Sequence, residues 1–215
     1  MVNLVLPSQS VFRLAAANES LLLLLLSMIL FVGVSVLVGI LNTKIMKDKQ
    51  FKISLIGNVF LSGVISTLLY LRYGLSMTAV QGIILFFILL YASCSDITSH
   101  TMDDYLWVMV LILGLLSVPT VGLTPMLTGA LMVLVPQILI AMLPPHRALG
   151  GADIKLSTAL AFLLGWQRGL AGLILGLLLA VITVSVVRKI GKRKKKEPFA
   201  LIPYLSVAAM VMFLI

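Results

Sequence analysis

Two aspartates stand where an otherwise apolar chain could carry out acid and base chemistry. The chain has seven acidic residues; Asp96 follows a long apolar run and Asp153 opens a later one. Ionisable groups at membrane depth are costly, so each is a candidate functional residue, the alternative being a helix-end residue in the headgroup zone. Two carboxyls that meet can share a proton, so that one polarises a peptide carbonyl while the other activates water. The pair predicts an aspartic peptidase if the side chains meet in space.

Three further charged residues lie close to these aspartates in the sequence. Asp103 and Asp104 precede an apolar segment, where they could cap its helix or bind a basic substrate. Lys155 comes two residues after Asp153 and could either extend to the lipid headgroups or help to place that carboxylate. We treat all three as candidate substrate-binding residues.

Composition indicates which elements must position these residues. Of the 215 residues, 61% are hydrophobic and 11% are charged, well outside the range of soluble domains. The apolar runs are long enough to cross a hydrocarbon core of about 30 Å as helices, and the short alternating segments of a β-barrel are missing. We therefore expect an all-α polytopic membrane protein, a single transmembrane peptidase domain over residues 1–215 with no soluble domain. About eight spans are predicted: Ser20–Asn42, Ile53–Leu71, Met77–Ser95, Tyr105–Val121, Pro125–Leu143, Asp153–Trp166, Gly169–Ile190 and Phe199–Ile215.

The distribution of basic residues predicts how these spans are oriented. Lys and Arg gather in two clusters, Lys44–Lys52 and Arg188–Lys196, each at the end of an apolar run. With the N-terminus outside, thirteen of the sixteen basic residues fall on the cytoplasmic side, as the positive-inside rule requires. Asp96 and Asp153 then lie at the cytoplasmic face. The clusters are typical of topology signals and anionic-lipid contacts, and we expect no nucleic-acid partner.

The helix ends predict different roles for the two carboxyls. Asp96 is expected at the carboxyl end of a helix, where the macrodipole disfavours a negative charge, and Asp153 at the amino end of another, where it favours one. On this basis Asp96 is expected to hold the shared proton and Asp153 to act as the base.

Four segments resemble conserved parts of the type IV prepilin peptidases, which are GxGD-type membrane aspartyl proteases. DITSHTMDD at 96–104 is similar to their first catalytic segment, and GGADIKL at 150–156 resembles the second. GILNTKI at 39–45 and PFALIPY at 198–204 resemble the end of the family's first span and the start of its last. The resemblance covers most of the chain in the right order.

The resemblance implies that Asp96 and Asp153 are the catalytic pair. It also implies an active-site loop formed by Gly150, Gly151 and Ala152. Two residues depart from the family pattern, Asp103 where Pro is usual and Ala152 where the last Gly of GxGD is expected. An alanine there is compatible with the family pattern unless the position requires a positive φ.

No cofactor is expected from these patterns. Cys94 is the only cysteine, and His100 and His146 are too few and too far apart to predict a metal site. Many family members carry a two-CxxC zinc module between their first two spans, where this chain has a Lys-rich loop. Those members typically also methylate the processed pilin, so S-adenosylmethionine is implied here only if methylation is retained.

The resemblance implies a membrane-embedded endopeptidase of the bacterial inner membrane. It would remove the short basic leader from type IV prepilins, or from the pseudopilins of type II secretion, at the cytoplasmic face. Its partners would be those substrates and membrane lipids. Two alternatives remain: a small proton- or cation-coupled transporter that uses Asp96 and Asp153 as a relay, and an assembly factor in which both acids are structural. A transporter would favour acids near the mid-membrane and an internal repeat, and no repeat is evident.

Overall fold

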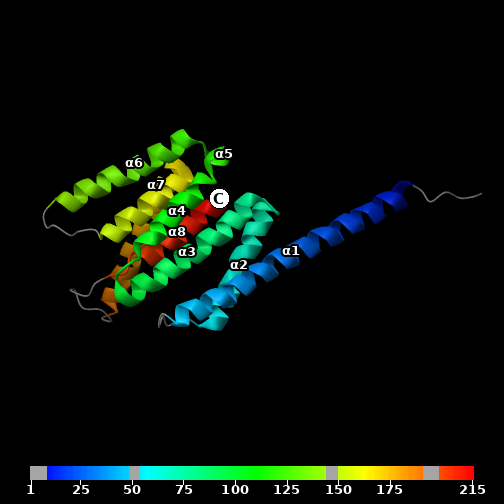
Figure 1. Cartoon of the computed structure of the whole chain (residues 1–215), viewed down its shortest axis with the longest axis horizontal. Coiled ribbons are helices and arrows are strands. Elements are labelled where there is room, and N and C mark those ends of the chain that lie inside the picture. The colour runs from blue at the N-terminus through cyan, green and yellow to red at the C-terminus, as the bar shows by residue number, and fades with distance from the viewer. Residues whose placement is uncertain (1–8, 49–53, 144–149, 191–198) are drawn as a thin grey trace, which may run out of the picture.

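The described part of the chain is built of helices. The computed structural model describes residues 9–48, 54–143, 150–190 and 199–215, with the backbone alone for residues 9–20 and 48. The elements are α1 (Gln9–Asp48), α2 (Leu55–Tyr73), α3 (Met77–Ser99), α4 (Asp104–Leu115), α5 (Val118–Val121), α6 (Leu123–Met142), α7 (Gly151–Lys189) and α8 (Ile202–Leu214) (Figure 1). The prediction of an all-α membrane protein is confirmed.

The number of long helices differs from the predicted number of spans. Within the described residues, five helices are long and apolar enough to cross a membrane: Leu21–Lys47 of α1, then α2, α3, α6 and α7. The helices α4 and α8 are apolar but shorter. The predicted span Tyr105–Val121 is divided between α4 and α5, with Pro119 in the first turn of α5. Pro119 lacks the N–H group that would bond to the carbonyl of Leu115 four residues back, and α4 ends at Leu115, which accounts for the break.

The long helix α7 contains the sixth and seventh predicted spans, divided at one glycine. Gly165 has φ 79° and ψ 173°, which interrupts the helix one residue before the predicted end of the sixth span at Trp166. A methyl group built at Gly169 would lie 2.6 Å from Ala161 Cα, so the two arms of α7 are in close contact beside the break. A methyl group built at Gly129 of α6 would lie 2.7 Å from the backbone nitrogen of Trp166. Small residues therefore let α6 and both arms of α7 pack closely.

The glycine pair in the second arm of α7 packs against α8. A methyl group at Gly176 would lie 2.9 Å from Leu205 Cδ2, and one at Gly172 would lie 3.4 Å from Met212 Cγ. This is the close helix packing that a GxxxG pattern favours. It fixes the position of α8 beside α7.

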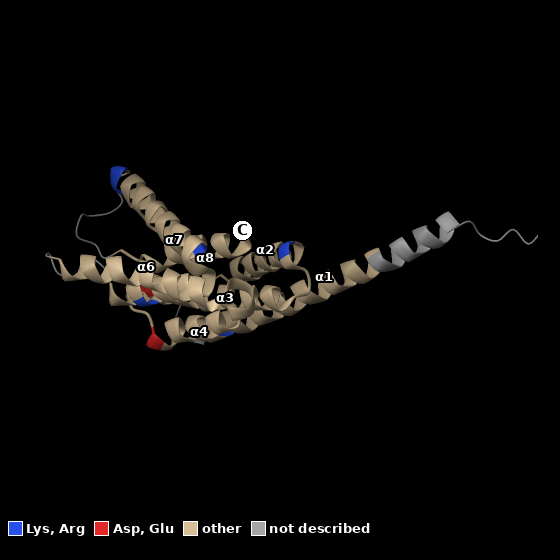
Figure 2. Cartoon of the chain, turned by 90° about the horizontal axis from the view of Figure 1, so that it is seen from above, with Lys and Arg blue, Asp and Glu red and all other residues tan. Residues whose placement is uncertain are grey.

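The helices α3, α4, α7 and α8 share an apolar core. Its buried members include Leu89 of α3, Val110 of α4, Leu156 of α7 and Ile202 of α8. In contrast, α1 extends away from the bundle (Figure 1), and its residues Leu21–Leu26 are 49–66% exposed, as expected of side chains that face lipid. Most of the described charged residues lie towards the helix ends, and Arg168 lies beside the break at Gly165 within α7 (Figure 2). The carboxyl end of α3 and the amino ends of α4, α7 and α8 meet at one end of the bundle.

Candidate active site

The end of α3 is shaped by its hydroxyl side chains. His100 ends the helix in a left-handed conformation with φ 51°, and its N–H donates to the Asp96 carbonyl. The Ser95 hydroxyl donates to the Thr101 carbonyl at 2.9 Å, and the Ser99 hydroxyl donates to the Ser95 carbonyl at 2.8 Å. Such side-chain bonds offer the backbone alternatives to further helix. They hold the turn that carries Asp96.

Asp96 faces the start of α8. Its side chain is 7% exposed, and its Oδ2 accepts a hydrogen bond from the Ile202 N–H at 3.0 Å. The first N–H groups of a helix have no partner within the helix, so they are suited to holding a carboxylate. The Ser93 hydroxyl donates to Ser206 Oγ at 3.0 Å and joins α3 to α8 just below this contact.

The amino end of α8 is therefore a part of the site that sequence reasoning missed. Residues 198–204 resembled a family segment, but Ile202 had been given no role. A backbone N–H leaves no side-chain signal in a sequence. Pro203, in the first turn of α8, was the one sign that a helix with free N–H groups begins here.

Asp153 lies in the first turn of α7, half-buried, beside Gly150. The Gly150 backbone forms a hydrogen bond with the Asp153 carboxyl. A methyl group built at Gly150 would lie 2.8 Å from Asp153 Oδ2, whereas one at Gly151 would meet nothing within 4 Å. Gly150 thus leaves the space in which the carboxyl lies against the main chain.

The expected active-site loop is not a loop. Gly150 is the N-cap of α7, with φ −69°, and Gly151 and Ala152 already belong to its first turn. The helix can begin this early because none of the three residues has a positive φ. Alanine has a high helix propensity, so Ala152 in place of the family's glycine is compatible with this backbone.

The two carboxyls lie at the same end of the bundle (Figure 1). The Asp153 carboxyl lies within the electrostatic influence of Asp96, although the two residues belong to different helices. Asp96 is in the last turn of α3 and Asp153 in the first turn of α7, so neither lies at the middle of a span as a transporter relay would favour.

The expected division of roles between the carboxyls does not follow from this geometry. The prediction considered only the helix that carries each aspartate. In the structure both carboxyls accept backbone hydrogen bonds, Asp96 from Ile202 and Asp153 from Gly150. The start of α8 thus gives Asp96 the same kind of donor as Asp153 has. The acid and base roles belong to the coupled pair.

An ion pair connects the start of α4, which follows the Asp96 segment, to the first turns of α7, which carry Asp153. Lys155 Nζ lies 2.6 Å from Asp104 Oδ1 and 5.9 Å from the centroid of the Trp107 ring. The hydrogen bond from Lys155, and then its charge, hold the pKa of Asp104 below its usual range. Asp104 therefore stays ionised, and the pair intact, into mildly acidic solution. Asp103 is the N-cap of α4 without a side-chain capping bond, and its carboxylate interacts with Tyr105 instead.

We expect this ion pair to affect substrate turnover more than stability. The Asp104 side chain is 74% exposed, and exposed pairs contribute little to folding. Asp104→Asn and Lys155→Met should each lower kcat/KM by about fivefold while leaving the melting temperature unchanged. The exchanged double variant, Asp104→Lys with Lys155→Asp, should recover the part of that loss that comes from the ion pair, with Asp103→Asn as the control that leaves the pair intact. Failure of the exchange to restore turnover would show that the contact between α4 and α7 has no role.

The remaining candidates contribute less to the site. Cys94 is a half-buried free cysteine in the last turns of α3. His146 lies outside the described residues, as do Lys49–Lys52 and residues 191–198, which hold most of the second basic cluster.

Comparison with known proteins places these residues in a family. The type IV leader peptidase family matches residues 83–186. This part of the chain belongs to that family. No curated protein and no solved structure matches the chain.

The family match contains both aspartates and the residues between them. It begins within α3 and ends within α7, and it includes the Asp104–Lys155 pair and Gly150. It does not reach α8, so the Ile202 contact comes from the structure alone. The match over residues 83–186 supports a peptidase of the leader peptidase kind, which is a hydrolase, and the long apolar helices agree with a membrane protein.

Proposed function

We propose that the protein is an aspartic endopeptidase that removes the basic leader from type IV prepilins or pseudopilins. The observation that carries the proposal is the placement of the Asp96 and Asp153 carboxyls at the same end of the bundle, where the charge of one acts on the other. Each is held by a backbone donor, so their positions do not depend on flexible side chains. Membership of residues 83–186 in a peptidase family agrees with this chemistry.

In the proposed reaction the pair shares one proton. The ionised carboxyl takes a proton from a water molecule as its oxygen bonds to the scissile carbonyl carbon. The protonated carboxyl donates to the carbonyl oxygen and stabilises the charge that develops there. When the tetrahedral intermediate collapses, the C–N bond breaks and the leaving amine receives a proton from the pair. The two carboxyls supply both acid and base, so the reaction includes no metal or S-adenosylmethionine.

The substrate is proposed to approach from the cytoplasmic side of the bacterial inner membrane. The excess of basic residues in the cytoplasmic loops supports this orientation. Asp103 and Asp104 lie at the same end of the bundle as the carboxyl pair and would attract a basic leader. A leader held there would leave the following apolar helix of the substrate in the bilayer.

Co-expression with candidate substrates tests the proposal. We expect one or more prepilins or pseudopilins to gain electrophoretic mobility, and mass spectrometry to locate the new N-terminus between the basic leader and the apolar helix. A vector without the peptidase gene is the control. If every prepilin-like protein of the host genome stays full-length beside well-expressed enzyme, the proposed substrate class is wrong.

A further inference from the structure

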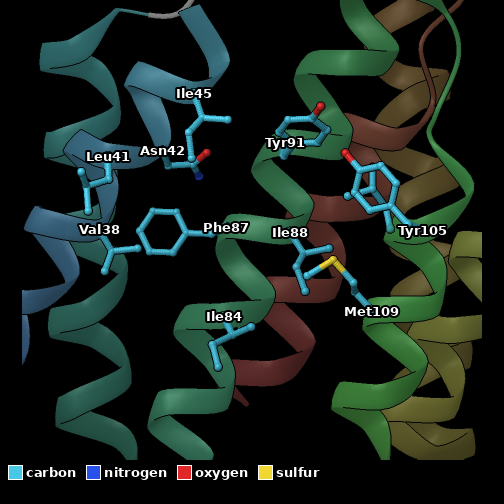
Figure 3. Close-up of a pocket in the computed structure, with 11 residues that line it drawn as sticks. Val38, Leu41, Asn42, Ile45, Ile84, Phe87, Ile88, Tyr91, Tyr105 and Met109 are labelled. Atoms are coloured by element: carbon cyan, nitrogen blue, oxygen red, sulfur yellow. The ribbon is translucent and has the colours of Figure 1, made fainter. Parts of the chain in front are cut away.

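An apolar groove runs along the membrane-facing side of α3, between α1 and α4. Its cavity volume is about 380 Å³. Figure 3 shows Ile84, Phe87 and Ile88 of α3 on its floor, with Val38 of α1 and Met109 of α4 at its sides. Eight of its eleven lining residues are apolar, and none is charged. A cavity of this size is within the range of ligand sites and can accept side chains of a partner helix.

The polar lining residues lie towards the end of the groove that leads to the carboxyl pair. They are Asn42, Tyr91 and Tyr105. The Tyr105 phenol interacts with Tyr91 and with Asp103, so the rim of the groove is joined to the acidic start of α4. The next residue, Asp104, pairs with Lys155 of the first turns of α7. The amino end of α4 thus stands between the groove and Asp153.

We infer that this groove holds the apolar helix of the peptide substrate. The inference rests on the proposed function and adds the place where the substrate binds. The surface changes from apolar at Ile84, through the tyrosines, to acidic at Asp103 and Asp104. A substrate whose apolar helix follows a basic leader has the complementary order of chemistry along its length. Its helix would occupy the groove while the peptide bond before it reaches the carboxyl pair.

The way helices pack in lipid would allow this groove to select among apolar substrate helices. Association of helices within a bilayer depends on close packing rather than on the hydrophobic effect, because lipid tails are equally apolar. A concave surface on α3 can therefore select a helix whose side chains fill it. Filling the groove with a larger side chain should exclude that helix without changing the carboxyls.

The test compares two substrates and two pairs of matched variants. Ile84→Trp and Met109→Trp fill the groove, while Val80→Trp and Ile112→Trp place the same ring on the same helices outside it. Ile84 and Val80 are both 42% exposed, so their substitutions perturb α3 to a similar degree. One substrate is a prepilin with its apolar helix. The other is a soluble peptide that contains the leader and the scissile bond but lacks the apolar helix. The enzyme is purified full-length and kept in lipid nanodiscs.

We expect the groove variants to raise KM at least about tenfold for the helix-bearing substrate and to leave cleavage of the short peptide unchanged. The two controls should match wild type on both substrates. Equal effects on both substrates, or no effect on either, would overturn the inference; equal effects are also the result expected if the groove holds lipid alone.

If wild-type enzyme cleaves neither substrate, the proposed function fails. Binding of the helix-bearing substrate to an Asp96→Asn background, with and without Ile84→Trp, then still tests the groove.

Discussion

Asp96→Asn and Asp153→Asn are each expected to abolish prepilin cleavage in cells. Each carboxyl supplies half of the acid–base chemistry, and loss of one such group typically lowers rates by about 10²–10⁴-fold. The amide has nearly the same shape, and its oxygen can still accept the Ile202 N–H that Asp96 accepts now. The proteins should therefore remain in the membrane at wild-type levels. Immunoblots of substrate and enzyme from the same cells measure both quantities.

Asp103→Asn is the matched control for this pair. It removes a carboxylate from the same end of the bundle but leaves Asp96 and Asp153 in place. We expect it to retain most of the cleavage activity. Near wild-type cleavage by either Asp96→Asn or Asp153→Asn would remove that residue from the catalytic pair.

Gly150→Ala is expected to lower kcat strongly, whereas Gly151→Ala should have little effect. The added methyl at Gly150 would lie 2.8 Å from Asp153 Oδ2, so the carboxyl has to move away from its backbone donor. A displacement of about 1 Å in a catalytic group can cost on the order of 100-fold in rate. At Gly151 a methyl group meets nothing within 4 Å. Steady-state kinetics on the purified variants measures the difference.

The stability of the two glycine variants separates this effect from misfolding. Within the first turn alanine favours helix over glycine, so Gly151→Ala should not lower the melting temperature. Gly150 is the N-cap, where alanine is less favourable than glycine, so Gly150→Ala should lower the melting temperature only slightly and leave the protein folded. Equal activity of Gly150→Ala and Gly151→Ala would show that the position of the Asp153 carboxyl beside Gly150 is unimportant for turnover.

The positions of the helices were largely predictable, because long apolar runs must satisfy their backbone hydrogen bonds as helices within a bilayer. The predicted Ile53–Leu71 corresponds to α2, Leu55–Tyr73, and Pro125–Leu143 corresponds to α6, Leu123–Met142. Whether a given apolar run forms one continuous helix was less predictable. Pro119 divides α4 from α5, whereas Pro136 lies within α6 without ending it. Both prolines lack an N–H group, but only Pro119 coincides with a break between helices, and the sequence alone does not reveal which proline will do so.

The two aspartates could be chosen from the sequence because charged groups are rare in apolar segments. The contacts that surround these aspartates could not be predicted from the sequence. The Ile202 N–H comes from a helix more than a hundred residues along the chain, and the Asp104–Lys155 pair depends on how α4 packs against α7. The role of Gly150 also depends on the rotamer of Asp153. A pattern of residue types contains none of these contacts.

The central claim is that Asp96 and Asp153 together hydrolyse a peptide bond. Its most direct test uses the purified protein in liposomes with one purified prepilin, and the released leader is measured by mass spectrometry while an internal dye reports proton flux. We predict a single cut between the leader and the apolar helix, lost in both Asp96→Asn and Asp153→Asn, with no proton flux. An intact prepilin together with proton flux that requires the same two aspartates would contradict the account and support a transporter.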